Sequence, residues 1–182
     1  MRPIDFAGFA GDCTISGKLT MFGDRLTDFL NGQERFRVHH LECQSLEDGH
    51  TISLDSISLE RSDLMAVVAS GPRGAEGQRL ALTRNRLQIS IGPYLILGQI
   101  HAKRGTDALA SVLKREAMVP LTSATIAYEA AGTFFVADVG TIIVNRHLVE
   151  WISPTTEAAT LFPDALVRSP FVAQLTKHAE TS

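Results

Sequence analysis

Two stretches of this 182-residue chain are alike enough to indicate an internal duplication. The first, residues 15–30, reads ISGKLTMFGDRLTDFL, and the second, residues 96–113, reads ILGQIHAKRGTDALASVL. When the two are aligned, Gly17 meets Gly98, and an apolar helical triplet follows each glycine. The order of elements also agrees before and after these stretches, which favours duplication over a chance likeness.

Each half has the pattern of a small β-rich unit with one short helix. A strand with alternating apolar residues comes first, and Leu26, Phe29 and Leu30 then lie on one face of a helix. Further strands are predicted at residues 36–44, 51–59 and 64–69. A unit of about sixty residues is only marginally stable alone, so we expect the two units to pack together.

The predicted fold is mainly β (α+β), with two pseudo-repeated small β-barrel or sheet units, each with one short helix, packed into one compact body. Its predicted parts are repeat unit 1 at 1–70, a linker loop at 71–79, repeat unit 2 at 80–152 and a C-terminal arm at 153–182. The linker is predicted from its glycines, its proline and its charges.

The composition is typical of a globular protein, with 45% hydrophobic and 20% charged residues. The formal net charge of −3 argues against a protein that coats nucleic acid by bulk electrostatics, but it permits a local basic patch. The two cysteines cannot form a disulfide framework, so a reducing, cytoplasmic location is expected. No apolar run approaches the ~20 residues of a membrane span, and none is predicted.

Part of the pattern resembles an uncharacterised bacterial small β-domain, present here as a tandem repeat. The residues that carry the resemblance are Gly17, Leu19, 25–31 (RLTDFLN), Phe36 and 59–67 (LERSDLMAV). The closing part is also similar to the second conserved motif of Sm-like proteins, which have a small SH3-like barrel. The chain departs from the Sm pattern, because it lacks an Asn-Gly after the first barrel strand and the matching Asp…Asn pair that holds RNA bases. The resemblance therefore implies a fold and transfers no functional residue.

No catalytic, cofactor-binding or metal-binding motif is found in the sequence. His39 and His40 would point to opposite faces of a strand, and no Cys or His spacing matches a zinc site. Cys13 follows a Gly-Asp turn in an apolar setting, which predicts a buried and unreactive thiol. We therefore expect no enzyme activity and no cofactor; an enzyme or small-ligand barrel would need a pocket, which a sequence does not show.

Charge is distributed unevenly along the chain. Residues 79–115 are basic and residues 42–63 are acidic. They form two solvated faces, or a basic patch for a phosphate backbone or an acidic partner, or two surfaces that stack between copies of the chain. Nucleic-acid modules add exposed aromatic residues for base stacking, whereas aromatic residues are only 7% here. The core is predicted to contain Tyr94, Phe134, Phe135 and Trp151. Protein–protein contact is therefore favoured.

The C-terminal arm contains apolar clusters around Phe162 and Phe171, broken by Pro163 and Pro170. The prolines exclude one long helix. The arm is either a segment laid over its own domain or one that is exchanged with a neighbouring subunit or offered to a partner.

The predicted function is a non-enzymatic protein-interaction or scaffolding module that self-assembles as a homo-oligomer or binds another protein. The alternative is an Sm-like nucleic-acid (RNA) binding protein that uses the basic face of residues 79–115. The candidate interaction residues are Arg84, Arg86, Lys103, Arg104, Phe162 and Phe171.

Overall fold

The computed structural model describes residues 2–23, 25–70, 82–103, 105 and 107–155. Its first half contains β1 (Arg2–Ala10), β2 (Cys13–Met21), α1 (Leu26–Gly32), β3 (Arg35–Ser45), β4 (Thr51–Glu60), the 3-10 helix η1 (Arg61–Asp63) and β5 (Leu64–Val68). Its second half contains β6 (Leu82–Ile91), β7 (Tyr94–Lys103), α2 (Ala108–Leu113), β8 (Met118–Ala130), β9 (Thr133–Asn145) and β10 (Trp151–Pro154). The predicted linker and nearly all of the predicted arm lie outside the described residues.

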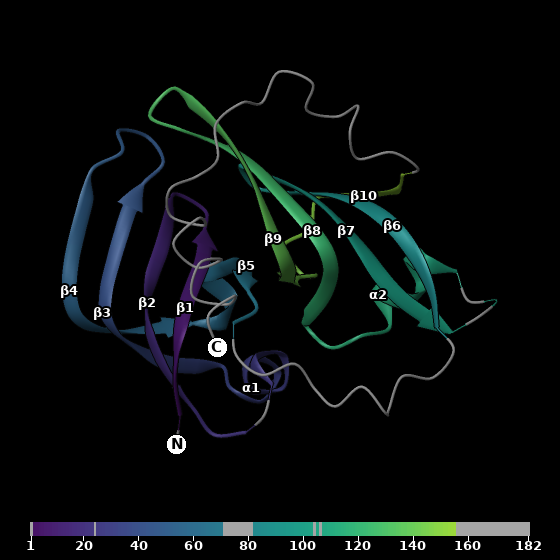
Figure 1. Cartoon of the computed structure of the whole chain (residues 1–182), viewed down its shortest axis with the longest axis horizontal. Coiled ribbons are helices and arrows are strands. Elements are labelled where there is room, and N and C mark those ends of the chain that lie inside the picture. Colours follow the sequence, from purple (N-terminus) through teal and green to yellow (C-terminus); the bar gives the residue numbers. More distant parts are fainter. Residues whose placement is uncertain (1, 24, 71–81, 104, 106, 156–182) are drawn as a thin grey trace.

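The ten described strands form one antiparallel sheet, which confirms the prediction of a mainly β protein. Their order is β10-β6-β7-β8-β9-β5-β1-β2-β3-β4. In each half, therefore, the fifth strand lies beside the first, and the second, third and fourth strands follow. Figure 1 shows β4 at the left edge of the molecule and β6 and β10 toward the right. None of the described helices is long and apolar enough to cross a membrane.

Gly17 and Gly98, which align in the sequence, lie at equivalent irregularities of the sheet. The register between β2 and β3 shifts at Gly17, and the register between β7 and β8 shifts at Gly98. A Cβ on Gly17 would lie only 2.6 Å from Val38 Cγ1, and a Cβ on Gly98 only 2.8 Å from Leu121 Cβ. Both bulges therefore need a residue without a side chain, because the strands approach too closely for one.

The core consists of two apolar clusters, and each takes residues from both halves of the chain. The cluster built mainly by the second half includes Phe9 and Ala66 from the first half. The cluster built mainly by the first half includes Met118 and Ile143 from the second half. Burial of apolar surface therefore holds the two halves against each other.

Tyr94 of the second half packs against and hydrogen-bonds to β1 of the first half. Its ring centroid lies 5.2 Å from that of Phe9, and its hydroxyl donates a 2.7 Å hydrogen bond to the carbonyl of Ala10. The predicted core position of Tyr94 is confirmed, since it is fully buried. The same prediction is wrong for Phe134 and Trp151, which are 46% and 49% exposed because they lie at a hairpin end and in an outer strand.

The two halves meet along β5 and β9. The register pairs Ala66 with Val144, Val67 with Ile143, and Val68 with Ile142. All six side chains are buried. The backbone pairing continues past β5, because the N–H of Ala69 donates a 2.9 Å hydrogen bond to the carbonyl of Thr141. We call this pairing of β5 with β9 the internal joint.

Two asparagines add hydrogen bonds between the halves, one of them at the internal joint. The side-chain amide of the buried Asn145 donates to the carbonyls of Arg61 and Leu64, at 3.3 Å and 3.1 Å. Asn31, in α1, exchanges two hydrogen bonds with the backbone of Met118, at 3.0 Å and 2.9 Å. These bonds satisfy backbone groups that the strand ladder leaves open.

Candidate functional site

The outer strand β4 carries an exposed row of apolar side chains. Ile52, Leu54 and Ile57 are 48%, 42% and 36% exposed. Their partners in β3 are Cys43, Leu41 and Val38. The row therefore continues the apolar face of the core beyond β3, to a place where no described strand covers it.

This edge has few of the features that usually protect an outer strand, with only Asp55 and Glu60 as charged residues. Natural edge strands are often short, or they carry Pro, Lys or a bulge that prevents pairing with another chain. β4 is ten residues long, reads TISLDSISLE, and keeps one register with β3 from Thr51 to Glu60. Its outward backbone N–H and C=O groups are therefore placed to pair with a further strand.

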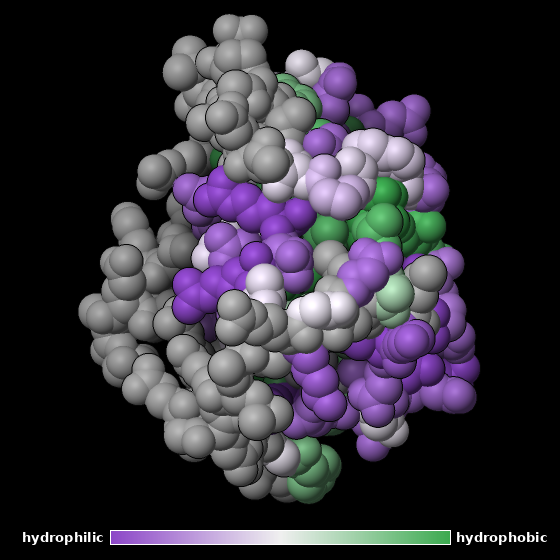
Figure 2. All heavy atoms as spheres, turned by 90° about the vertical axis from the view of Figure 1, so that its right-hand side faces the viewer, coloured by the Kyte–Doolittle hydropathy of each residue, from purple (hydrophilic) through white to green (hydrophobic). Residues whose placement is uncertain are grey.

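The opposite edge of the described sheet is β10. It holds the single tryptophan of the chain, Trp151, which pairs with Ser90 of β6. Figure 2 views the molecule from its β6 side and shows a largely hydrophilic described surface, with a hydrophobic patch toward the right and smaller hydrophobic areas at the top and bottom. The two edges of the sheet, β4 and β10, thus both present large apolar side chains.

Three of the predicted interaction residues share one face of the β6–β7 pair. Arg84 and Arg86 are two residues apart in β6, so they point to the same side. Arg84 pairs with His101, and Lys103 lies two residues further along β7 on that side. All three basic side chains are exposed. The other candidates, which lie outside the described part of the chain, are Arg104, Phe162 and Phe171.

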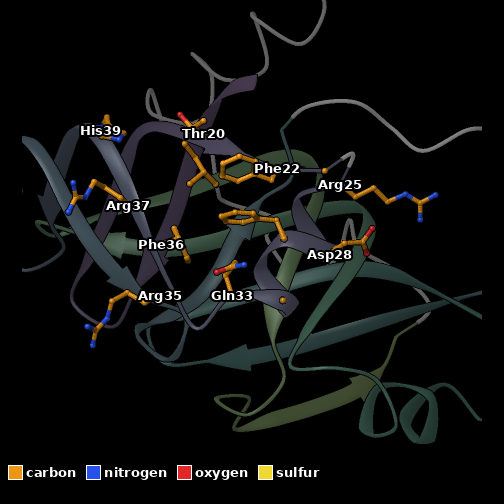
Figure 3. A pocket seen from close by; sticks show the side chains of 13 residues that line it. Thr20, Phe22, Arg25, Asp28, Gln33, Arg35, Phe36, Arg37 and His39 are labelled. Carbon is orange, nitrogen blue, oxygen red and sulfur yellow. The ribbon is translucent and has the colours of Figure 1, made fainter. Parts of the chain in front are cut away.

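An open groove of about 460 Å³ lies among the end of β2, α1 and β3. Phe22, which is 70% exposed, lies beside it. Figure 3 shows Arg25 and Asp28 on one side, with Arg35 and Arg37 on the other. Arg25 points away from the groove on one side, and Arg35 and Arg37 point away from it on the other, so the groove is an apolar hollow with charges around it and not a converging anion site.

Sequence reasoning missed both the row on β4 and the groove. TISLDSISLE predicts a half-buried strand, and such a pattern is the same for an inner and an outer strand. The only sequence signal for the groove is that the apolar strand pattern ends at Met21 and leaves Phe22 before a glycine.

Burial raises the pKa of two side chains, the Cys13 thiol and the Tyr94 hydroxyl. Burial, together with the adjacent Cys43 thiol, raises the pKa of the half-buried Cys13 thiol well above its usual value. Burial likewise raises the pKa of the Tyr94 hydroxyl. A thiol that stays protonated is a poor nucleophile. Within the described ranges, no group of three or more His, Cys, Asp or Glu side chains is placed to hold a metal ion.

Comparison with known proteins identifies no relative. No protein-family model, curated protein or solved structure matches this chain. Any function must therefore be argued from the geometry of β4, β10, the basic face and the groove.

Proposed function

We propose that this protein is a non-enzymatic interaction module that self-associates through the edge of β4. The observation that carries the proposal is the exposed row of Ile52, Leu54 and Ile57 on an unprotected outer strand. In β-strand addition, the backbone hydrogen bonds supply affinity, and the side chains of alternate residues supply specificity. β4 offers both, because no described strand pairs with its outer backbone edge and none covers its apolar row.

We further propose that the chain is a tandem repeat of one small β unit, as the sequence suggests. The strand order is the same in both halves. His40 and Ser123, which lie opposite the two glycine bulges, both adopt left-handed backbone conformations, with φ of 47° and 49°. Two equivalent backbone bonds of 2.8 Å join Arg61 N–H to Glu34 C=O and Arg146 N–H to Ala117 C=O. These agreements concern backbone geometry and support duplication more strongly than residue identity alone. The free thiols of Cys13 and Cys43 fit a reducing, cytoplasmic location.

A second candidate function is nucleic-acid binding through the basic face. The observation that favours it is the shared orientation of Arg84, Arg86 and Lys103. Such a face would contact phosphates without reading sequence. The net charge of −3 and the exposed apolar edge make protein contact the first proposal.

The self-association proposal is tested by light scattering on a gel-filtration column over a wide range of protein concentration. We expect a mass above that of one chain, increasing with concentration. Ile57→Lys should shift the mass toward the monomer, because it places a charge in the apolar row while leaving an exposed position of the fold otherwise intact.

Thr133→Lys is the matched control, since Thr133 is also an exposed strand residue but belongs to the β8–β9 hairpin. It should leave the mass unchanged. A wild-type protein that remains monomeric at every concentration would rule out self-association. If Ile57→Lys leaves the mass of the assembly unchanged, the contact between copies does not lie at β4.

The nucleic-acid alternative is tested by titrating labelled RNA and DNA oligonucleotides at several salt concentrations after nuclease treatment of the protein. We expect no tight binding at physiological salt. Submicromolar binding that weakens for every sequence when Arg84, Arg86 and Lys103 become Ala, with a smaller salt dependence, would make this alternative the first candidate.

A further inference from the structure

We infer that the strand that pairs with β4 is β10 of a second copy of this chain, so that chains associate head to tail. The inference rests on the proposed function, since it names the interface through which self-association occurs. Its basis is the internal joint, in which a fifth strand of one half already pairs with a fourth strand of the other half.

The first step is that β10 is the counterpart of β5. Val67 of β5 pairs with Gly8 of β1, and Ile152 of β10 pairs with Ile89 of β6. Gly8 and Ile89 hold the same position, because each lies three residues before the glycine that begins the following hairpin turn. Ile152 therefore corresponds to Val67, and its neighbours correspond in turn.

The second step is that β4 is the counterpart of β9. The last residue of β4, Glu60, pairs with the first residue of β3, Arg35. In the same way, the last residue of β9, Asn145, pairs with the first residue of β8, Met118. Counted back from these ends, Ile57 corresponds to Ile142 of the internal joint.

These correspondences fix the register of the joint between copies. Transferred from β5–β9, the register pairs Trp151 with Leu59, Ile152 with Ser58, and Ser153 with Ile57. The internal joint buries every side chain at these positions. In the isolated chain, Ile57 is 36% and Trp151 49% exposed, so the two outer strands of the described sheet carry the apolar area that such a joint would cover.

The end of β4 and the turn before β10 carry opposite charges, at Glu60 and Arg146. Asn145 of the internal joint contacts the carbonyl of Arg61, and Arg61 corresponds to Arg146 in the second half. At the joint between copies, Glu60 takes the place of Asn145 and therefore lies near the backbone of Arg146 of the second copy. In the isolated chain Glu60 pairs with Arg35, and Arg146 Nε donates to the carbonyl of Glu116, so a Glu60–Arg146 pair would form by exchange of these contacts. The joint also places β4, which lies in the acidic segment 42–63, two strands away from β6 of the second copy, which lies in the basic segment 79–115.

Two differences make the joint between copies weaker than the internal one. Pro154 takes the place of Ala69, whose N–H bonds to Thr141, and proline has no N–H to donate. Asn145 donates two side-chain hydrogen bonds to backbone carbonyls in the internal joint. Glu60 has no side-chain amide N–H, so it makes no such bonds in the joint between copies. We therefore expect an assembly that dissociates on dilution.

The geometry also sets the type of assembly. Each copy uses β4 toward one neighbour and β10 toward the other, so the contact is not self-complementary. Contacts of this kind build a closed ring when the rotation between copies closes, and a filament when it does not.

Trp151 provides a first test without any substitution. It is the single tryptophan, so the emission spectrum of the protein reports on β10 alone. We expect the emission to move to shorter wavelengths as the concentration rises and the indole loses water. Ile57→Lys should raise the concentration at which half of this change occurs by about tenfold or more, the order expected when an apolar side chain leaves an interface.

A second test fixes the register by cross-linking. Ile57→Cys and Ser153→Cys are made in separate full-length proteins, mixed and oxidised. Both positions are outside the buried core, and the corresponding internal pair, Ile142 and Val68, is a non-hydrogen-bonded pair, with the short Cα separation that a disulfide tolerates. We expect a covalent heterodimer.

Ile52→Cys mixed with Ser153→Cys is the register control, because Ile52 lies five residues, roughly 17 Å, further along β4. It should not cross-link above the background set by Cys13 and Cys43 in the wild-type protein. Equal cross-linking of Ile52→Cys and Ile57→Cys would overturn the inferred register.

The outcomes separate this inference from the proposed function. A protein that stays monomeric at every concentration would contradict both the proposed function and this inference. An assembly that forms without a spectral change at Trp151 and without the Ile57→Cys/Ser153→Cys link overturns the inference and leaves self-association standing. A monomer that assembles only when residues 156–182 are removed would mean that the chain's own C-terminal segment covers β4, which also overturns the inference.

Discussion

Replacement of Gly17 or Gly98 by alanine tests whether the two bulges require glycine. A Cβ on Gly17 would lie 2.6 Å from Val38 Cγ1 and 2.8 Å from the carbonyl oxygen of His39. The carbonyl belongs to the backbone of β3 and has little freedom to move. A Cβ on Gly98 would lie 2.8 Å from Leu121 Cβ, which is also fixed by the backbone.

The magnitude follows from two opposing effects. Excess atoms in a well-packed site cost about 1–3 kcal/mol of unfolding free energy. Alanine offsets about 0.4–1 kcal/mol of this, because it restricts the unfolded chain more than glycine does. We therefore expect each substitution to lower the free energy of unfolding by about 1–2 kcal/mol. For a chain of this length, the thermal midpoint should fall by roughly 2–8 °C.

Urea denaturation followed by circular dichroism measures both variants. Gly32→Ala is the matched control, since a Cβ there meets no atom within 4 Å and the residue ends helix α1 on the surface. It should unfold at the wild-type urea concentration or slightly above it. If Gly17→Ala and Gly98→Ala are as stable as the wild type, the strands have room for a Cβ, and close approach does not explain the aligned glycines.

Two further predictions concern the contacts between the halves. Tyr94→Phe should lower the free energy of unfolding by about 1–2 kcal/mol, because the carbonyls of Ala10 and Cys13 lose the hydroxyl that reaches them at 2.7 Å and 3.2 Å; urea denaturation checks this, and an unchanged midpoint would show that the hydroxyl adds nothing. Iodoacetamide should modify Cys13 much more slowly than free cysteine at pH 8, and the rate should keep rising beyond pH 9, because a raised pKa leaves little thiolate at lower pH. Peptide mass spectrometry measures the rate, and modification as fast as that of free cysteine would contradict the raised pKa.

The sequence alone determined the local structure of this protein. Alternating apolar residues specify strands, and Leu26 and Leu30 specify the buried face of α1, because these patterns depend only on the geometry of neighbouring residues. The alignment of Gly17 with Gly98 marked two equivalent positions, and only the register of the sheet showed that both are bulges. Strand content and the short helices follow from information of this kind.

Tertiary structure alone decided which strands remain open. Ile57 and Ile142 hold corresponding positions in β4 and β9, and both belong to alternating apolar strands. Ile142 is fully buried because β5 pairs with β9, whereas Ile57 is 36% exposed because no described strand lies beyond β4. Trp151 is exposed for the same reason at the other edge. A residue's own sequence neighbours define the face on which it lies, but only the order of strands in the sheet determines whether that face is covered.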